Sequence, residues 1–371
     1  MKILFVTTVS ETANTFLIPH IRMLLNQGHS VDVAFSINQD VSPEFSQFGC
    51  KIYNLSFRRS PFSFANYKAY LRIKKLLVSE KYELVHTHTP IASAFVRLAC
   101  IRLKSIIVIY TSHGFHFYKG SSLASWIFYY PIERFLANFT DLLITINSED
   151  YIRAKNSFHA KYVEYIPGIG IDLVKFKIGK IDKSGFRKEI GISNDDFLML
   201  SVGELNNNKN HEIVLRALSG TRNKNIFYVI CGLGKKYDYL IELAKSLGIS
   251  NQVKLIGYRK DIKDIYQSSD LFVFPSIREG LSVSLMEAMA SGLPVICSNI
   301  RGNNDLIDDF MGGFLINKKS IKDYSNSIIR LFLDKGLRNQ MGTYNFIKVN
   351  RFDLEIVKTK MNQLYQMINV K

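Results

Sequence analysis

Short apolar runs alternate with longer amphipathic segments through the first half of the chain. The apolar runs lie at residues 3–6, 31–35, 52–55, 84–86, 106–110 and 142–146. Between them, segments such as 16–27 and 67–79 repeat apolar residues at helical spacing, and Gly28 closes the first of these segments. Strands that alternate with helices predict a parallel sheet covered by helices, which is the doubly wound α/β arrangement.

The second half of the chain repeats this alternation. Further apolar runs lie at residues 198–202, 226–231, 253–256, 271–274 and 295–297. The turn-rich segment PGIGID begins at Pro167, and a lysine-rich segment at 175–188 follows it. We therefore predict two domains of one class, residues 1–167 and 168–349, joined by this linker, with a last helix near 354–368.

Composition limits the kinds of partner that the chain is expected to bind and the compartment in which it is expected to work. The 371-residue chain is 47% hydrophobic, with a formal net charge of +16 and a sequence pI near 9.5. This balance predicts an anionic partner: a nucleic acid, a nucleotide or an acidic membrane surface. The four cysteines lie in or beside apolar runs, at positions 50, 100, 231 and 297, and favour buried free thiols. No apolar run approaches the roughly 18 residues that span a bilayer, and the opening MKILFVTT is too short for a signal peptide. We therefore expect the chain to stay in the compartment where it is made.

The segment 268–304 carries the strongest candidate chemistry. Its apolar run 271–274 predicts a strand and residues 281–290 predict a helix. The loop between them holds Glu279, and the helix holds Glu287. Open parallel sheets bind ligands where their strands end, and a helix that begins there presents free N–H groups to phosphate. Two solvated surface glutamates are the structural alternative.

The motif F-P-S-x-x-E-G-x-x-x-x-x-x-E-A-M-A-x-G-x-P-V-I in this segment resembles the donor-sugar motif of the family-four retaining glycosyltransferases, which have the GT-B fold. The resemblance implies two Rossmann-like, doubly wound domains facing a central cleft. The first would bind the acceptor and the second the nucleotide sugar, while a C-terminal helix within 350–371 would cross back to the first domain.

The same resemblance implies roles for the residues of the motif. Glu279 would contact the hydroxyls of the donor sugar, and Glu287 would hold the nucleotide ribose. A carboxylate suits both tasks, since it accepts hydrogen bonds from two hydroxyls. Gly280, Leu281 and Ser282 open the predicted helix and are expected beside the phosphates.

The stretch V-G-E-L-N-N-N-K resembles the family's V-G-R-L-x-x-x-K segment, whose two basic groups neutralise the donor diphosphate. Lys209 matches the lysine, and Gly203 would lie beside the nucleotide. Glu204, however, stands where the family has arginine, so one expected positive charge is missing. We expect Arg278 or Lys235 to compensate. A solvated turn is the structural alternative for this asparagine-rich loop.

Two further loops of the second half follow apolar runs. Gly232 begins a G-L-G turn that lacks the third glycine of the dinucleotide fingerprint, and Gly257 and Tyr258 follow the next run. In the family the glycine pair lies beside the nucleotide and the second loop contacts the base. Tyr258 is therefore expected to stack on uracil. A tight turn and an aromatic residue at the protein surface are the alternatives.

Histidines end two neighbouring strands of the first half. His88 lies in H-T-H-T-P and His113 in T-S-H-G-F-H, and His113 resembles the family's cleft histidine near the reacting centre. Structural histidines are the alternative, and no zinc site is expected, because no acid or cysteine is suitably spaced. The loop after the first strand lacks the Gly-Gly pair of many family members. Either the chain does without it, or Ser10 and Asn14 supply side-chain donors.

Basic and aromatic residues mix in two segments of the first half, 57–75 and 115–130. Most aromatic residues of the second segment are expected in the core, but a mixed surface of this kind suits an anionic membrane. The segments H-T-H-T-P, T-S-H-G-F-H and S-N-I-R-G-N-N-D-L-I resemble the bacterial branch of the family that builds capsule, O-antigen and exopolysaccharide. Its members use their first half for an isoprenoid-diphosphate-linked acceptor.

These patterns lead to one functional prediction. The chain would be a retaining transferase that moves a hexose or N-acetylhexosamine from a UDP-sugar to a lipid-linked saccharide. It would be cytoplasmic and act peripherally at the inner face of the cell membrane. His113, Glu279 and Lys209 are the candidate catalytic residues. No cofactor or metal is expected, because D-x-D occurs nowhere in the chain.

Three alternatives remain open. The chain could be a catalytically silent, transferase-like subunit, as the replacement at Glu204 favours. It could be a basic nucleic-acid-binding protein, although no recognised motif supports this and we expect no nucleic-acid partner. A UDP-sugar epimerase would share the two-domain architecture.

Overall fold

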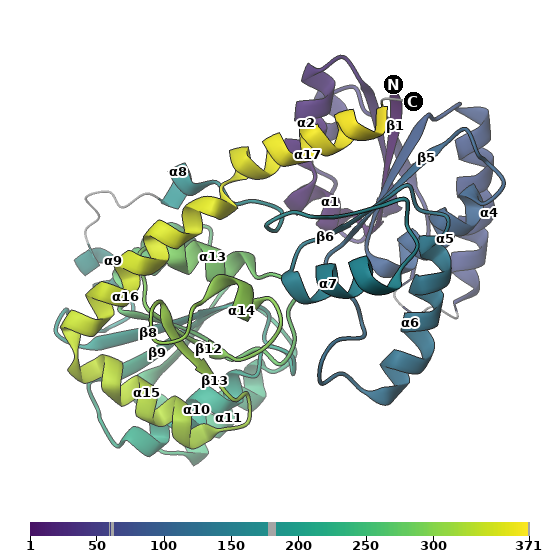
Figure 1. Cartoon of the computed structure of the whole chain (residues 1–371). Helices are drawn as coiled ribbons and strands as arrows, with labels where there is room; N and C mark the ends of the chain where they lie inside the picture. The colour runs from purple at the N-terminus through teal and green to yellow at the C-terminus, as the bar shows by residue number, and fades with distance from the viewer. Residues whose placement is uncertain (59, 61–62, 177–182, 370–371) are drawn as a thin grey trace. The chain divides into compact units, whose positions relative to one another are not determined.

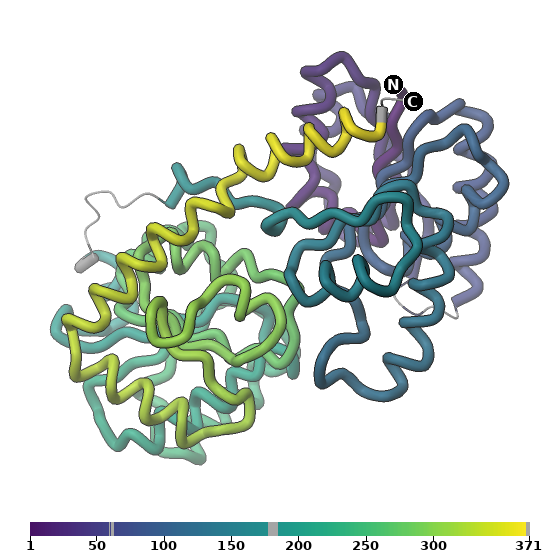
Figure 2. The backbone as a smooth tube through the Cα atoms, viewed as in Figure 1, coloured from purple at the N-terminus to yellow at the C-terminus, as the bar shows by residue number. Residues whose placement is uncertain are grey.

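The computed structural model describes residues 1–58, 60, 63–176 and 183–369 (Figure 1). The chain divides into two compact units. Unit 1 contains Met1–Ile169 and Glu355–Lys371, and unit 2 contains Gly170–Leu354. Figure 2 follows the first and last segments of the chain, coloured purple and yellow, into unit 1. The sequence placed the two changes of domain after residues 167 and 349.

Unit 1 is built on a seven-stranded parallel sheet with the order β3-β2-β1-β4-β5-β6-β7. Its strands are β1 (Lys2–Val9), β2 (Ser30–Ser36), β3 (Ile52–Asn54), β4 (Leu84–His88), β5 (Ile107–Ser112), β6 (Leu142–Thr145) and β7 (Tyr162–Tyr165). The sequence predicted all of them except β7. This edge strand is short and only Val163 in it is buried, so it lacks a continuous apolar run.

The helices of unit 1 cover this sheet. They are α1 (Ser10–Phe16), α2 (Ile18–Asn26), α3 (Pro43–Gln47), α4 (Phe64–Ser79), α5 (Pro90–Cys100), α6 (Leu123–Ala137), α7 (Ser148–Ser157) and α17 (Leu354–Asn369). The single helix predicted at 16–27 is wrong at its start, because the chain turns at Leu17 and α2 begins at Ile18, with Pro19 in its first turn. Gly28 follows the end of α2 with a φ of +81°, as its conformational freedom allows.

The last helix, α17, packs on unit 1. Tyr365 Oη lies 2.6 Å from His86 Nδ1 on β4, and the amides of Gln27 and Asn362 form a hydrogen bond. Both Tyr365 and His86 are buried. The end of the chain is therefore fixed to the core of the unit in which the chain begins.

Unit 2 repeats the topology of unit 1 with six parallel strands in the order β10-β9-β8-β11-β12-β13. The strands are β8 (Phe197–Val202), β9 (Ile226–Cys231), β10 (Val253–Gly257), β11 (Leu271–Phe274), β12 (Val295–Ser298) and β13 (Gly313–Ile316). Strand order reverses between β1 and β4 in unit 1 and between β8 and β11 in unit 2. Ligands of doubly wound sheets bind at such switch points, beyond the carboxyl ends of the strands.

The helices of unit 2 complete its layers. They are α8 (Leu173–Phe176), α9 (Lys183–Glu189), α10 (His211–Thr221), α11 (Tyr237–Ser246), α12 (Ile262–Ser268), α13 (Val283–Ala290), α14 (Asn303–Leu306), α15 (Ile321–Leu333) and α16 (Lys335–Lys348), with 3₁₀ turns at Ser250–Gln252 and Val349–Phe352. The linker predicted at 175–188 falls partly on residues 177–182, which lie outside the described residues. The sequence did not predict β13.

The sequence led to expectations about the cysteines and about membrane-spanning segments. All four cysteines are free and buried, which confirms the interpretation of their apolar surroundings. In the part of the chain that the structure describes, no helix has the length and apolar character to cross a membrane.

Candidate functional site

The loops after β8 and β11 meet at the switch point of unit 2. Lys209 Nζ lies 2.7 Å from Glu279 Oε1, and both side chains are mostly buried, with exposures of 18% and 14%. The loop backbones are also joined, since the Ile277 amide donates to the Asn208 carbonyl at 2.7 Å. Two residues that the sequence singled out on separate motifs therefore form one ion pair.

Close backbone contact explains the glycines of these turns. A Cβ at Gly232 would lie 1.9 Å from the Gly203 carbonyl oxygen, so no side chain fits between the turns after β8 and β9. A Cβ at Gly203 would in turn meet Lys209 Cε at 3.0 Å. The glycines therefore keep these turns close enough for Lys209 to run past them to Glu279.

Helix α13 begins directly after the Glu279 loop. Ser282 is its N-cap and accepts a hydrogen bond from the Leu285 amide at 3.3 Å, so the predicted start at 281 lies two residues early. Gly280 and Leu281 form the approach to this cap. The other first-turn N–H groups of α13 have no partner within the helix and can receive an anion.

Glu287 lies on α13, where Tyr266 Oη donates to its Oε2 at 3.0 Å. Burial raises the pKa of the Glu287 carboxyl to about 7, against the opposing influences of the Tyr266 hydrogen bond and the Lys175 charge. Near neutral pH the neutral and ionised forms of the Glu287 carboxyl are therefore both populated. A ligand that donates hydrogen bonds to it would favour the ionised form.

The structure places Glu204 at the surface of the β8 turn, where it accepts a hydrogen bond from Asn206 Nδ2 at 2.9 Å. Arg278 and Lys235, the expected compensating cations, are exposed. A third cation, Arg301, lies mostly buried beside the Glu279 loop, and its Nε donates to the Glu279 carbonyl oxygen at 3.2 Å. In the sequence Arg301 appears only within the segment S-N-I-R-G-N-N-D-L-I, without a role of its own, so its place beside Glu279 became evident from the fold.

The turns after β9 and β10 also lie together, because the Gly232 amide donates to the Gly257 carbonyl at 2.8 Å. Tyr258 follows with 72% of its surface exposed. Its ring is open to a planar ligand, so the predicted stacking on a base remains a prediction.

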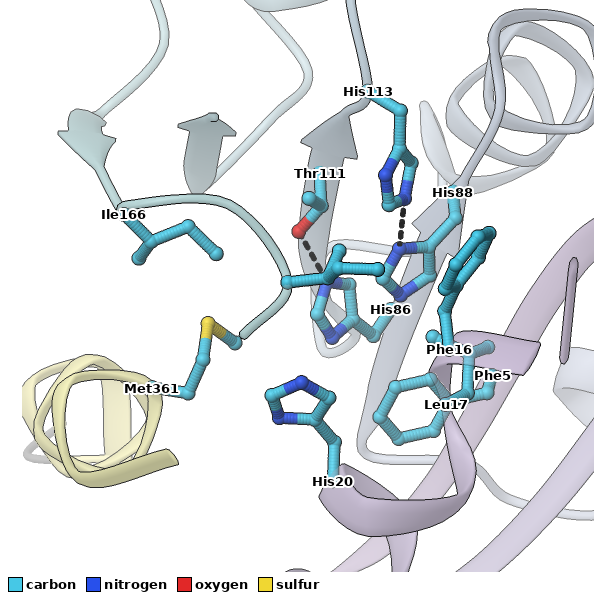
Figure 3. A pocket seen from close by; sticks show the side chains of 11 residues that line it. Phe5, Phe16, Leu17, His20, His86, His88, Thr111, His113, Ile166 and Met361 are labelled. Atoms are coloured by element: carbon cyan, nitrogen blue, oxygen red, sulfur yellow. Dashed lines mark hydrogen bonds between the residues drawn. The ribbon is translucent and has the colours of Figure 1, made fainter. Parts of the chain in front are cut away.

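In unit 1, four histidines surround a cavity of about 20 Å³, which is room for about one water molecule (Figure 3). His113 Nε2 lies 3.1 Å from His88 Nδ1, and His86 Nε2 lies 2.8 Å from Thr111 Oγ1. The rings of His86 and His88 stack with centroids 4.2 Å apart. His20 of α2 is the fourth member.

These histidines are neutral at pH 7. Burial lowers the pKa of His20 and of His113 to about 4, and burial together with the neighbouring histidines lowers the pKa of His86 and His88 well below 6.5. Between His88 and His113 one nitrogen donates and the other accepts. His88 Nε2 is buried without a partner, and a buried orphan N–H is rarer than an orphan acceptor. The geometry therefore favours the tautomer in which His88 Nδ1 carries the hydrogen and donates a hydrogen bond to His113 Nε2.

The segment after β1, predicted as a loop, is helix α1, and its polar side chains bond within unit 1. Ser10 Oγ is buried and donates to Asn38 Oδ1 at 3.0 Å, and Asn14 Nδ2 donates to the Asp40 carbonyl at 2.8 Å. Of the two alternatives for the missing Gly-Gly pair, the structure favours the one in which the chain does without it, because the Ser10 hydroxyl is already bonded to the neighbouring loop. Among the described residues, no group of three or more His, Cys, Asp or Glu side chains could hold a metal ion.

Comparison with known proteins places these features in context. The family model "Glycosyl transferase 4-like" matches residues 2–147, and the model "Glycosyl transferases group 1" matches residues 182–347. EpsD of Bacillus subtilis (strain 168) is 34% identical over 370 residues, which are 98% of this chain and 96% of EpsD. The UDP-Gal:alpha-D-GlcNAc-diphosphoundecaprenol alpha-1,3-galactosyltransferase of Escherichia coli is 32% identical over 311 residues, 80% of this chain and 79% of that enzyme.

Solved structures share the fold. Anabaena Alr3699/HepE in complex with UDP superposes with a TM-score of 0.82 at 20% identity, over 99% of this chain and 100% of that chain. WaaG, a glycosyltransferase of lipopolysaccharide biosynthesis, superposes with a TM-score of 0.77 at 16% identity, over 98% of this chain and 99% of that chain. The predicted GT-B class, with two doubly wound parallel sheets, is confirmed.

The environment of Glu287 generates a prediction that needs no ligand. Its pKa is raised on folding, so its stabilising contribution is fully present below the unfolded pKa of about 4.5 and is lost as the pH rises through about 7. Between pH 4.5 and pH 8, wild type should lose stability relative to Glu287→Gln, by about 3 kcal/mol at most. Urea denaturation of both proteins across this range measures the difference. Glu204→Gln controls for loss of a surface carboxylate, and parallel curves for wild type and Glu287→Gln would contradict the prediction.

Proposed function

Because this chain belongs to the group 1 glycosyltransferases, we propose that it transfers a hexose or N-acetylhexosamine from a UDP-sugar to an isoprenoid-diphosphate-linked saccharide, with retention of the anomeric configuration. In this proposal unit 2 binds the nucleotide sugar and unit 1 binds the acceptor. The pairing of Lys209 with Glu279 beside the start of α13 is the observation that carries it.

The proposed donor site works by an exchange of partners. In the free chain the Lys209 ammonium is balanced by Glu279. A diphosphate at the start of α13 would attract Lys209 and leave the carboxylate of Glu279 to accept hydrogen bonds from sugar hydroxyls. The lysine would then face the negative charge that grows as the diphosphate leaves, which is where preorganised charge lowers a barrier most effectively.

Neighbouring groups complete this proposed site. Glu287 would accept the two ribose hydroxyls, oriented by the Tyr266 hydroxyl. Arg301 would restore part of the positive potential that Glu204 removes, because its guanidinium lies against the Glu279 loop. Support for a uridine nucleotide comes from HepE, which was solved with UDP and with UDP-glucose.

In unit 1, His113 would act as a neutral hydrogen-bonding group toward a sugar hydroxyl. Its lowered pKa makes it unsuited to supply a positive charge at pH 7. His88 would fix its tautomer through the bond between His88 Nδ1 and His113 Nε2.

A lipid-linked acceptor is supported by the name of the Escherichia coli relative, whose substrate is a diphosphoundecaprenol-linked sugar. Such an acceptor would bring the protein to the cytoplasmic face of a membrane. The exposed face of α4 suits that location, because it carries four cations and no acid: Lys68, Arg72, Lys74 and Lys75. Of the segment 57–75 first considered, Arg59 and residues 61–62 lie outside the described residues, and Phe57 is buried in the core.

A catalytically silent subunit is the second candidate, and the exposed carboxylate of Glu204 favours it. Screening UDP-sugars for slow hydrolysis and for thermal stabilisation separates the two. Stabilisation by UDP without hydrolysis or transfer of any sugar, in the presence of a lipid-linked acceptor, would favour the silent subunit.

Three substitutions separate the proposed roles. Lys209→Ala should lower kcat, by about a hundredfold if it matches the loss of one oxyanion donor. Glu287→Gln should raise the donor KM more than it lowers kcat, because ribose binding is equal in ground and transition states. Glu279→Gln should change both. Steady-state kinetics measures these effects. The control is Lys224→Ala, an exposed lysine just before the amino end of β9, whereas the site lies beyond the carboxyl ends of the strands. An unchanged kcat for Lys209→Ala would overturn its assignment.

Activity should persist in excess EDTA. Lys209 and the N-terminus of α13 would balance the diphosphate charge directly, so no bridging cation is needed. Donor hydrolysis or transfer measured before and after chelation checks this expectation. Loss of activity that magnesium or manganese restores would show that a metal bridges the diphosphate.

Reversal of the α4 charges should release the protein from anionic vesicles. Each cation near such a surface contributes about 1 kcal/mol of attraction, and glutamate would add repulsion. The variant carries Lys68→Glu, Arg72→Glu, Lys74→Glu and Lys75→Glu and is assayed by vesicle flotation. The control reverses four exposed lysines of unit 2: Lys224, Lys245, Lys319 and Lys322. Equal release of both variants would mean that net charge, and not the α4 face, governs binding.

A further inference from the structure

Helix α6 is apolar on nearly all sides. Its sequence, LASWIFYYPIERFLA, contains only two charged residues, Glu133 and Arg134. A helix that is apolar all round is normally buried all round, because an exposed apolar face gains nothing from water. In unit 1, however, only one side of α6 is covered (Figure 1).

The covered side of α6 is held firmly. Trp126 and Tyr130 pack against Phe117, and Leu136 is buried. Glu133 Oε2 lies 2.7 Å from Arg97 Nη2 of α5, and the Arg97 side chain is completely buried. A buried ion pair of this kind fixes which side of a helix faces the core, since rotation would strand both charges. The orientation of α6 is therefore built in.

The opposite side of α6 is exposed. Five large apolar side chains lie there with at least half of their surface open: Leu123 (75%), Ile127 (58%), Phe128 (60%), Ile132 (50%) and Phe135 (54%). Their spacing places them on one half of the helix, and Arg134 is the only charged residue of that half. An apolar surface this continuous marks a binding surface.

Helix α4 belongs to the same layer, because α4 packs on α5 and α5 packs on α6. Its outer face also exposes large apolar side chains: Phe64, Tyr67, Leu71 and Val78. These alternate with the four α4 cations. The layer therefore presents one helix that is apolar and one that is both apolar and basic, which is the composition of surfaces that lie at an anionic lipid interface.

We propose that the exposed side of α6 inserts among the acyl chains of an anionic bilayer while α4 lies at its headgroups. The proposal rests on the proposed function, which places the acceptor in a membrane, and adds the surface and the depth at which the protein docks. The charge of α4 selects this occupant. A second copy of the same layer would bring eight like charges of the two α4 helices together, and no acidic surface lies on this layer to receive them.

Insertion of α6 makes a contact that α4 alone would not. Attraction between α4 and headgroups is screened by salt, whereas apolar burial of α6 is not. Binding should therefore persist in part at raised salt. Unit 1 would then be held at a fixed depth, with its acceptor site at the level of a lipid diphosphate.

The chain supplies its own probe, because Trp126 is its one tryptophan. Trp126→Phe combined with Phe128→Trp moves the fluorophore to the exposed side of α6. With vesicles of equimolar phosphatidylcholine and phosphatidylglycerol carrying brominated acyl chains, fluorescence at position 128 should be quenched strongly and that of Trp126 less. As a control, Trp126→Phe combined with Leu333→Trp places the fluorophore at an exposed apolar position of unit 2 and should show no quenching.

A second variant tests the energetic contribution. Ile127→Ser with Phe128→Ser should weaken vesicle partitioning at raised salt at least tenfold, because two exposed apolar side chains lose their contact with lipid. The matched control is Leu333→Ser with Ile347→Ser, at two exposed apolar positions of unit 2. Circular dichroism confirms that both variants are folded.

Two results would overturn the proposal. One is vesicle binding without quenching at position 128, which would leave the headgroup contact of α4 alone. The other is self-association in sedimentation experiments that Ile127→Ser with Phe128→Ser abolishes, which would make the α6 surface an interface between copies. Donor hydrolysis needs no membrane, so its rate in the same variants reports separately on the proposed transferase chemistry.

Discussion

The ion pair between Lys209 and Glu279 is the constraint on which the rest of unit 2 depends. Each charge is largely removed from water, so each needs the other while no ligand is bound. The glycine-lined turns, the bond between the two loops and the position of Arg301 all serve to hold these charges at the start of α13. A site whose own charges are balanced only by each other is prepared to exchange one partner for an incoming anion.

The histidine cluster of unit 1 handles buried polar groups in the opposite way. Its histidines lie close together, and burial keeps them neutral, so that hydrogen bonds replace ionic attraction. The bond from Tyr365 to His86 joins this cluster to the last helix of the chain. Neutral donors and acceptors suit sugar hydroxyls, whereas the fixed charges of unit 2 suit a diphosphate. The two units thus carry complementary chemistry on the same strand topology.

A single buried ion pair also governs the outer surface of unit 1. Arg97 and Glu133 decide which side of α6 is covered and therefore which side meets the surroundings. Together with the packing of Trp126 and Tyr130 on Phe117, that pair gives a mostly apolar helix one preferred rotation. In the proposed docking, the basic face of α4 in the same layer makes anionic lipid the partner of this apolar surface.

The sequence by itself determined the two parallel sheets, the buried cysteines and most of the candidate site residues. Apolar runs, helical periodicity and the spacing within a motif can all be read from short stretches of the chain, without knowledge of the tertiary structure. It missed the edge strand β7, whose sequence YVEY is not a continuous apolar run, it missed the short edge strand β13 although its sequence GFLI is apolar, and it missed the break between α1 and α2. Only the tertiary structure decided that Lys209 pairs with Glu279 across 70 residues, that Arg301 lies beside them and that Ser10 is already engaged. These contacts depend on strand order, which brings distant loops to one switch point and which no local pattern encodes.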